Sequence, residues 1–580
     1  MNTAFNAERP WRYLLVLLMS SLASAQVVPQ VAPTPVLGWK VVVNNGVVFP
    51  SPGETRLFNS YNQPSINVNN LVVFRARSKG GSSGEPAHGV LTRDMSRAGT
   101  PLTIIFDRTT TVPQPNNLGS LFIEPPSFPR IDMYSKTIAS RGNHQPVWQY
   151  TDSTGADTRA GTTGIYTNPF GPLVSGANNL GAAPGFDFFS VPGGCSSPGA
   201  EPRQCTKFDV FPGAPAVADA KTIVFKGNFT TTAGGKTGVY FRNLTNSAMA
   251  NPNGGPALEP AGGNNPVTLI ADSDSYIPGT SVRFGSTAPP SAVKKIAVFA
   301  GFDNEDAPTL GGIYMVHLTG SEPKLIPLVK IGGRVPGENG FFNKLGEGLS
   351  FDGRFVAFWG AWGTETKTLT LQCPNDGNKD RLAFCQTTYP NGFTTTVPLH
   401  QGIFVFDTEL ERVMAIAKTP NDFDDFVYWN FSGLVPGTGE SDDSGEPARW
   451  RSAEFMAVSG LLDGKLVGPK FSVAFKARKG QVTGESYVNP VDGIYIYNKQ
   501  NATNTPNYIT AVYTGMPGTL LDPQAVFVDS ETPGAPPVVL PVTEMGLERD
   551  GFRGNSLVIN ASMGTEEAGW AGIYLTTVPK

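Results

Sequence analysis

The residues best suited to chemistry in this chain are its histidines, of which the sequence holds four. Three of them, His88, His144 and His400, stand directly before or after short apolar runs that are typical of strands. Histidine titrates near neutral pH, so it can act as a general base or bind a metal. If these residues share one edge of the fold, the sequence predicts a proton-transfer site there. The alternative is that they are separate loop residues with hydrogen bonds of their own.

Arginine side chains flank two of the same predicted strands, at Arg77 and Arg478. Guanidinium groups at the mouth of a site would suit a carboxylated or sulfated ligand. With His88, His144 or Tyr150 as the base, such an arginine could neutralise a uronate carboxylate and stabilise the enolate that forms when the neighbouring proton is removed. Acidic residues in equivalent loops leave another interpretation open, in which the cations only form ion pairs.

Two tryptophans, Trp362 and Trp570, stand among glycines and charged residues, where an indole could stack on the apolar face of a sugar ring. Together with His400, Glu365 and Tyr487 they form the predicted ligand-binding set. These residue types indicate carbohydrate binding.

A short acidic stretch that includes Asp303 and Glu305 could bind calcium through oxygen ligands, although it lacks the full pattern of a known calcium loop. No other cofactor is expected. The sequence contains no Gly-x-Ser-x-Gly elbow, His-Glu-x-x-His motif, phosphate loop or dinucleotide fingerprint. The common hydrolase, metalloprotease and nucleotide chemistries are therefore disfavoured.

The four cysteines fall into two close pairs, Cys195 with Cys205 and Cys373 with Cys385, each inside a connection rich in glycine, proline or asparagine. We expect two local disulfides, as in exported proteins. A metal site is the weaker interpretation, because the spacings are long and no histidine accompanies either pair at the spacing of a zinc finger.

The elements that must position these residues recur along the chain. A glycine followed by a branched aliphatic residue and then usually an aromatic one occurs seven times, at intervals of about 74 to 91 residues, and most copies follow a second apolar run. The copies begin at Gly89, Gly164, Gly238, Gly312, Gly402, Gly493 and Gly572. Flanking runs bring each unit to four antiparallel strands, the pattern of a propeller blade. The sequence predicts an all-β, closed β-propeller with seven blades, and the alternative is an open β-solenoid.

The two ends of the sequence support closure of the ring. The last unit stops at Lys580 without a fourth strand, whereas residues 38–53 contain one predicted strand with no unit before it. Pairing the two would remove both exposed sheet edges. The predicted repeat units cover approximately residues 60–125, 126–210, 211–280, 281–338, 339–438, 439–520 and 521–580.

The loops between the second and third strands of each unit are long and variable, and the longest runs from Gly360 to Gln401. Loops of that length in a compact domain are usually functional or disordered, and the expected disulfide within it favours order. We therefore expect the working face at this rim and at the mouth of the central channel.

Residues 1–25 are typical of a secretory signal, with two arginines, an apolar run and small residues before a cleavage point. The remainder, residues 26–580, is expected to form a single exported domain, secreted or periplasmic. No later run reaches the roughly 18 apolar residues of a transmembrane anchor. The net charge of −4 gives no basic footprint, so nucleic acid is not an expected partner.

In the order of its strands and in its length, the chain resembles secreted seven-bladed propellers, loosely those with TolB and NHL-type repeats. The resemblance covers nearly all of residues 26–580, but it rests on generic motifs and implies only the fold. The favoured function is an exported binding or interaction protein that recognises a glycan or an extracellular partner on its loop-rich rim. The alternatives are a polysaccharide lyase acting on a uronate-containing polymer and a structural envelope or matrix protein, so whether the chain is an enzyme stays open.

Overall fold

The computed structural model describes residues 37–52, 55–80, 84, 86–198, 200, 203–375, 378–437, 447–460, 470–499, 508–528, 534 and 536–579. The predicted export signal, residues 1–25, lies outside these ranges.

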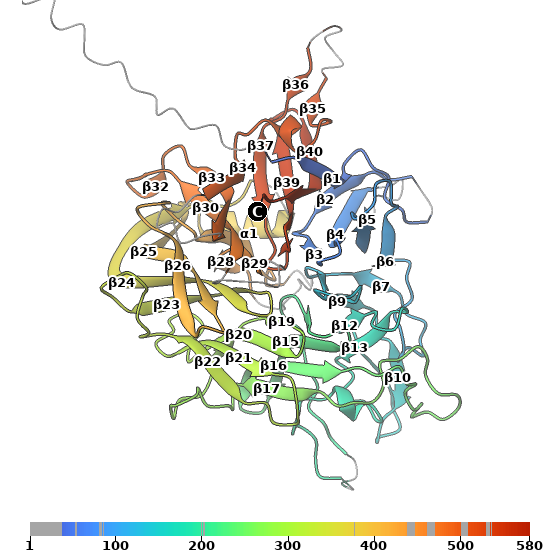
Figure 1. Ribbon diagram of the computed structural model, residues 1–580. Helices are drawn as coiled ribbons and strands as arrows, with labels where there is room; N and C mark the ends of the chain where they lie inside the picture. The colour runs from blue at the N-terminus through green and yellow to red at the C-terminus, as the bar shows by residue number, and fades with distance from the viewer. Residues whose placement is uncertain are drawn as a thin grey trace, which may run out of the picture. The chain divides into compact units, whose positions relative to one another are not determined.

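Between Leu37 and Lys580 the described chain forms seven antiparallel sheets that radiate from a common centre as propeller blades (Figure 1). The predicted all-β, seven-bladed fold is confirmed. In the first six blades four main strands follow one another in chain order, with the first strand nearest the centre, and the seventh is completed from the other end of the chain.

The first blade consists of β2 (Phe58–Tyr61), β3 (Ser65–Ile66), β4 (Leu71–Gly80), β5 (Pro86–Asp94) and β6 (Thr103–Asp107). The second consists of β7 (Phe122–Glu124), β8 (Arg130–Ile131), β9 (Ile138–His144), β12 (Thr163–Thr167) and β13 (Val174–Asn178). The third consists of β14 (Ala216–Val217), β15 (Thr222–Thr231), β16 (Gly234–Asn243) and β17 (Thr268–Asp272). The strands of the fourth and fifth blades are β18 (Ser286–Thr287), β19 (Ser291–Val293), β20 (Ile296–Phe302), β21 (Gly311–His317) and β22 (Leu325–Lys330); and β23 (Phe342–Phe351), β24 (Phe355–Leu371), β25 (Phe393–Asp407) and β26 (Arg412–Lys418). The strands of the sixth and seventh blades are β29 (Met456–Gly460), β30 (Phe471–Lys479), β33 (Val491–Lys499) and β34 (Tyr508–Tyr513); and β37 (Val542–Gly546), β38 (Phe552–Arg553), β39 (Ser556–Gly564), β40 (Gly569–Thr577) and β1 (Trp39–Asn44).

Shorter strands and helices lie in the segments that connect the blade strands. Among the described residues, four two-stranded sheets stand outside the blades: β10 (Trp148–Thr151) with β11 (Asp157–Ala160), β27 (Tyr428–Ser432) with β28 (Arg449–Ala453), β31 (Val482–Thr483) with β32 (Ser486–Tyr487), and β35 (Val526–Phe527) with β36 (Val538–Val539). The helices are α1 (Lys379–Thr388) and the short 3-10 turns η1 (Asp187–Phe189) and η2 (Gly518–Leu520).

The ring closes as the ends of the sequence predict. Strand β1 pairs antiparallel with β40, from Trp39 opposite Thr576 to Asn44 opposite Gly572, and becomes the outermost strand of the seventh blade. Strands from the two ends of the described chain therefore lie side by side in one sheet (Figure 1). Closure covers the edge of β40, and β1 takes the outer position that the fourth strand has in the other blades.

The recurring glycine has a steric cause. In the third strand of a blade, the aromatic residue two positions on lies on the same face, because side chains alternate along a strand. Its ring folds back over the glycine: a Cβ added at Gly238 would lie 2.5 Å from the Tyr240 hydroxyl, and one at Gly572 would lie 2.4 Å from that of Tyr574. Next to the motif, the pairing with the fourth strand shifts register in all seven blades, which adds a β-bulge and local twist.

The cores lie between blades rather than within them. One buried cluster, for example, joins Val43 and Ile573 of the last sheet to Phe58 and Phe74 of the first. Such packing of each sheet on its neighbours is what lets one domain grow to this size.

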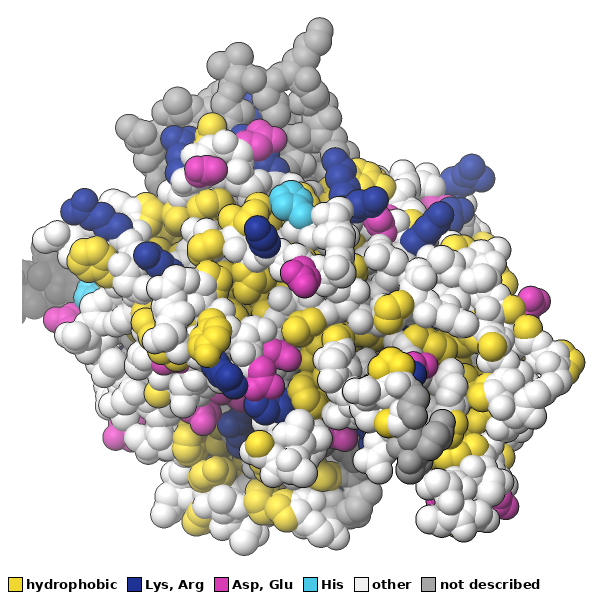
Figure 2. Space-filling model, turned by 90° about the horizontal axis from the view of Figure 1, so that it is seen from below, with side chains coloured by type: hydrophobic (Ala, Val, Ile, Leu, Met, Phe, Trp, Pro, Cys, Tyr) yellow, Lys and Arg dark blue, Asp and Glu magenta, His cyan; other side chains and the backbone are white. Residues whose placement is uncertain are grey.

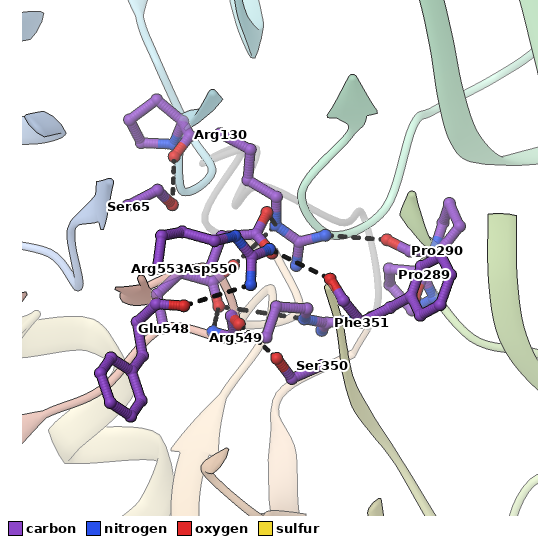
Figure 3. A network of polar contacts seen from close by, with 12 residues as sticks. Ser65, Arg130, Pro289, Pro290, Ser350, Phe351, Glu548, Arg549, Asp550 and Arg553 are labelled. Carbon is purple, nitrogen blue, oxygen red and sulfur yellow. Dashed lines mark hydrogen bonds and ion pairs between the residues drawn. The ribbon is translucent and has the colours of Figure 1, made fainter. Parts of the chain in front are cut away.

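The axis of the ring is filled by a buried polar network (Figure 3). Arg130 donates to Glu548 at 2.7 Å and to the Pro290 carbonyl at 2.8 Å, and Arg553 donates to the Val458 and Phe351 carbonyls at 3.2 Å. Arg130 is 1% exposed and Arg553 is 3% exposed. Because these partners come from five different blades, the network ties the inner ends of the sheets together and closes the axis at this level.

Candidate functional site

Two adjoining cavities lie next to the axial network, with volumes of about 260 Å³ and 460 Å³. Both are lined by Glu347, Ser452 and Glu454, so they adjoin each other, and the two together are here called the axial groove. Glu548 and Arg549 of the network line the smaller cavity. The larger cavity is bordered by the connection from the second to the third strand in the fourth and fifth blades and by the link that carries β27 and β28. This is the kind of rim that the loop lengths in the sequence single out.

Glu347 is presented by a bulge in β23. The pairing with β24 jumps from Leu345 opposite Gly360 to Leu349 opposite Phe358, so three residues, Gly346-Glu347-Gly348, stand opposite one. Such bulges often re-aim a side chain next to a functional site.

The two glycines of the bulge allow Glu454 to approach. A Cβ at Gly346 would lie 2.7 Å from Glu454 Oε2, and one at Gly348 would lie 2.8 Å from the Glu454 carbonyl oxygen. Glu454 itself stands between β28 and β29, at the entry to the innermost strand of the sixth blade. The bulge therefore brings carboxylates of two neighbouring blades to one place.

The surroundings of Glu347 and Glu454 raise the pKa of both carboxyl groups above the ordinary value of a glutamate. Desolvation, followed by the charge of Glu347, raises the pKa of Glu454 to about 8. The pKa of Glu347 is also raised by desolvation, against the opposing charges of Lys226 and Arg549, while its side chain is open to the groove. Glu454 therefore carries a proton at neutral pH, which is the state required of a hydrogen-bond donor or a general acid.

Aromatic side chains form the wall of the larger cavity, which Trp359, Trp429 and Trp450 all line. The indole nitrogen of Trp359 donates to Gln401 Oε1 at 2.9 Å, which fixes that ring. The ring of Trp450 lies parallel to that of Phe393, with centroids 6.4 Å apart and an interplanar angle of 10°. Phe393 begins β25, so the wall depends on the long extension of the fifth blade.

That extension is the connection which the sequence marks as longest. The strands β24 and β25 continue as a paired ribbon beyond the blade, from Thr366 opposite Pro398 to Leu371 opposite Phe393. The helix α1 follows β24, and its Cys385 is bonded to Cys373. Both predicted disulfides are confirmed, since Cys195 and Cys205 are also joined.

Arg449, another lining residue of the larger cavity, is held by acids of the fourth blade. Its guanidinium contacts Glu305 at 2.5 Å and Asp306 at 3.3 Å. Because Glu305 and Asp306 belong to the connection between β20 and β21, these ion pairs tie the fourth blade to the β27–β28 hairpin across the larger cavity.

The sequence-predicted residues occupy several different places. His88 is opposite Arg77 in the first blade, and both side chains approach Glu124, at 3.9 Å and 3.5 Å respectively. Arg478 forms two hydrogen bonds to Asp492, at 2.6 Å and 3.0 Å. Ion pairing within and between blades, the alternative interpretation of these cations, is thus what the structure shows at both positions.

His144 lies inside the second blade rather than on its rim. It is 3% exposed, its Nε2 is 2.5 Å from the Tyr166 hydroxyl, and its Nδ1 is 2.8 Å from the Gln145 carbonyl. Burial lowers its pKa to about 4. The difference from the expected position arises because β9 extends through His144, which pairs with Phe122. Tyr150 lies in the separate β10–β11 hairpin, where burial raises its pKa.

The predicted ligand-binding set is partly assembled. Trp362 and His400 stack with centroids 6.0 Å apart, and His400 Nε2 is 3.0 Å from Glu365, so these three gather in the fifth blade. Trp362 is only 6% exposed, because its ring packs in the core between blades. Tyr487 donates its hydroxyl hydrogen bond to Asp425 in the sixth blade, and Trp570 donates to Asp522 at 2.9 Å in the seventh.

The proposed calcium ligands already have partners. Asp303 accepts hydrogen bonds from the backbone N–H groups of Thr309 and Leu310, both at 2.9 Å, and Glu305 is paired with Arg449. Within the described ranges, no group of three or more His, Cys, Asp or Glu side chains is arranged to hold a metal ion. Calcium near Asp303 and Glu305 stays a prediction.

Sequence reasoning missed Glu347 and Glu454, the two titratable residues that line both cavities. One signal was present: a carboxylate between two glycines, Gly346-Glu347-Gly348, inside an apolar inner strand. Glycine within a strand pattern suggests a bulge or a close backbone approach. Nothing comparable marks Glu454.

A further cavity of about 570 Å³ lies away from the axis. Its walls come from the link between the second and third blades around the Cys195–Cys205 disulfide, together with a short stretch before β17. It lacks the convergence of several blades that distinguishes the axial groove.

On the face shown in Figure 2, described basic and acidic side chains are scattered among hydrophobic and uncharged ones. None of the helices in the described ranges is long and apolar enough to cross a membrane.

Comparison with known proteins adds little to this picture. No family model matches the chain, and no curated protein matches it. Among solved structures, it is similar to the β-propeller domain of the Trilobed protease from Pyrococcus furiosus, with 9% identity and a TM-score of 0.23, covering 65% of this chain and 84% of that one. It is also similar to a GH62 hydrolase in complex with xylotriose, with 6% identity and a TM-score of 0.22, covering 62% and 90%. Similarity at this level says nothing about the activity of this chain.

Proposed function

We propose that this protein is an exported β-propeller that binds a glycan in the axial groove. The observation that carries the proposal is the axial groove, in which two tryptophans, Trp429 and Trp450, stand beside two carboxyl groups. Trp359 lines the same groove but is 5% exposed and belongs to the core between blades. Indole rings provide flat apolar surfaces for the C–H faces of a sugar, and carboxyl groups exchange hydrogen bonds with its hydroxyls.

The construction of the groove supports a binding role. Its walls come from rigid strands and from a ribbon tied by a disulfide, so little ordering is needed when a ligand enters. The residues of the rim come from connecting segments that the strands of the blades hold in place, which is a common arrangement for binding sites. The two disulfides are in keeping with an oxidising compartment outside the cytoplasm.

Calorimetric titration of residues 26–580 with a panel of polysaccharides tests the proposal. The panel comprises xylan, arabinan, mixed-linkage β-glucan, polygalacturonate and alginate. We expect at least one to bind, and we expect Trp450→Ala to weaken that binding by about tenfold or more, equivalent to about 1.4 kcal/mol, because a stacking surface is lost.

The matched control is Trp570→Phe, which alters a tryptophan of another blade outside the groove. Thermal unfolding of each variant shows whether the fold survives, and Trp429→Ala gives a second test if Trp450→Ala unfolds. Binding of no glycan, or equal weakening by the control, would contradict the proposal.

A further inference from the structure

Glu347 and Glu454 occupy the junction of the two cavities, since both side chains line both of them. A saccharide chain that runs from the larger cavity into the smaller one must pass these two carboxyl groups. No other titratable residue is shared by the two linings among the described residues.

We propose that Glu454 and Glu347 hydrolyse a glycosidic bond of the glycan bound there, with Glu454 as general acid and Glu347 as general base. The inference rests on the proposed function, because it acts on the same ligand in the same groove. Hydrolysis of a glycosidic bond by a pair of carboxyl groups needs one that donates a proton and one that accepts it.

The steps balance without any cofactor. Glu454 transfers its proton to the glycosidic oxygen while the bond from that oxygen to the anomeric carbon breaks. Glu347 takes a proton from a water molecule whose oxygen forms the new bond to the same carbon. The products are two shorter saccharides that together contain the elements of that water. The proton then passes from Glu347 back to Glu454 through solvent, which restores both groups.

The assignment of roles follows from what surrounds each group. Glu454 is next to Glu347 and within the field of Asp425, both negative, which favours its protonated form. Glu347 accepts a hydrogen bond from the Ser286 hydroxyl at 3.4 Å and is within the field of the cations Lys226 and Arg549, opposed by Glu305. Desolvation still raises the pKa of Glu347 overall, but Lys226, Ser286 and Arg549 oppose that shift and so support the ionised form that a base requires.

The geometry of the bulge in β23 also brings Glu454 close to Glu347. A Cβ at Gly346 or Gly348 would collide with Glu454, so the two glycines let Glu454 approach the segment that carries Glu347. An inner strand with regular pairing would pack its side chains against neighbouring blades, as Leu345 and Leu349 do. The local break in pairing therefore costs sheet structure at the point where Glu454 approaches the bulge, as is common at functional sites.

The experiment measures binding and turnover on the same samples. Each glycan that binds in calorimetry is incubated with the protein, and new reducing ends and products are followed by colorimetry and chromatography. Oxygen-18 water shows whether the new reducing end has gained an oxygen atom from solvent. We expect turnover with oxygen-18 incorporation and a fall in rate above about pH 8, where Glu454 loses its proton.

The variants Glu454→Gln and Glu347→Gln should each lower the rate by about 100-fold or more while binding is retained within a few fold, because amides keep the shape but neither donate nor accept the proton. Glu322→Gln, at an exposed turn of the fourth blade, is the matched control and should leave the rate unchanged.

The possible failures are distinguishable. Binding without turnover, or full turnover by Glu454→Gln, overturns hydrolysis and leaves the glycan-binding proposal standing. Cleavage that creates an ultraviolet-absorbing unsaturated uronate without oxygen-18 overturns hydrolysis in favour of elimination. Failure of every glycan to bind overturns both proposals.

Discussion

At the scale of single residues, burial gives the titratable groups of this protein opposite tendencies. Desolvation holds a proton on Glu454, whose pKa is raised to about 8, and keeps one off His144, whose pKa is lowered to about 4. Both shifts follow from the cost of a charge away from water. Their positions differ, however: Glu454 lines a cavity, whereas His144 is enclosed against Tyr166 inside a blade. A shifted pKa marks a site only where a ligand could reach the group.

Because burial lowers the pKa of His144, this residue should make the free energy of unfolding depend on pH. The unfolded chain takes up a proton on this residue near pH 6.5, whereas the folded chain does so only near pH 4, so the free energy of unfolding should fall as the pH drops through this window. The shift corresponds to at most about 3 kcal/mol. Urea unfolding at several pH values between 4.5 and 7.5 measures the effect.

The variant His144→Gln should flatten the slope of stability against pH, since the substituted amide does not titrate. The control is His317→Gln, which changes an exposed histidine at the end of β21. If the slope of the His144 variant equals that of the unmodified protein, another group is responsible for the acid sensitivity.

At the scale of elements, a three-residue motif defines the third strand of a blade. In most blades its glycine leaves room for the aromatic ring two residues on, and in several of them that ring packs on a phenylalanine that precedes the second strand. The edge-on pairs include Phe122 with Tyr166, Phe284 with Tyr314 and Phe342 with Phe404, at centroid distances of 4.8 to 5.5 Å. Edge-to-face contacts of this kind add to the burial of area. The phenylalanine is part of the repeat, although its variable distance from the glycine hides it in the sequence.

The motif glycine should tolerate no side chain. A methyl group at Gly238 would lie 2.5 Å from the Tyr240 hydroxyl and 2.8 Å from Asp272 Cβ, so Gly238→Ala should destabilise the protein by about 1 to 3 kcal/mol. The matched control is Gly235→Ala in the same strand, where a methyl group would meet nothing within 4 Å. Denaturant midpoints compare the two. Equal stabilities would show that the tyrosine ring moves aside without cost.

At the scale of the whole molecule, stability depends on closure of the ring. Val42 and Val43 of β1 are fully buried between the last and first blades, and Asn44 donates to Asp522 at 2.8 Å. Burial of one such side chain contributes roughly 1.5 to 3 kcal/mol. The polar network at the axis joins the inner ends of the blades, so the ring is held at both its inside and its outside.

A chain that begins at residue 48 should therefore lose the outer strand of the seventh blade and expose the edge of β40. We expect a lower unfolding midpoint and a tendency to aggregate, relative to a chain that begins at residue 37. A synthetic peptide of residues 37–47 should restore part of the midpoint by adding the missing strand. Thermal unfolding with and without the peptide measures this, and an unchanged midpoint after truncation would show that closure contributes little.

The sequence by itself determined the repeat architecture, the closing strand and both disulfides. Each of these depends on patterns that are local or periodic: the glycine motif recurs in every unit, the unpaired strands stand at the two ends, and each cysteine lies near its partner. The packing of blade on blade then follows from the buried faces of the strands.

Only the tertiary structure decided which side chains share a site. Glu347 and Glu454 belong to different blades, and their meeting depends on the register of β23 with β24, which no periodicity reveals. Likewise, the burial of His144 and Trp362 depends on how far β9 extends and on how neighbouring blades pack. The sequence repeat predicts the fold because the same contacts between strands recur in every blade. The candidate site depends on one irregularity, the bulge in β23, which occurs in a single blade.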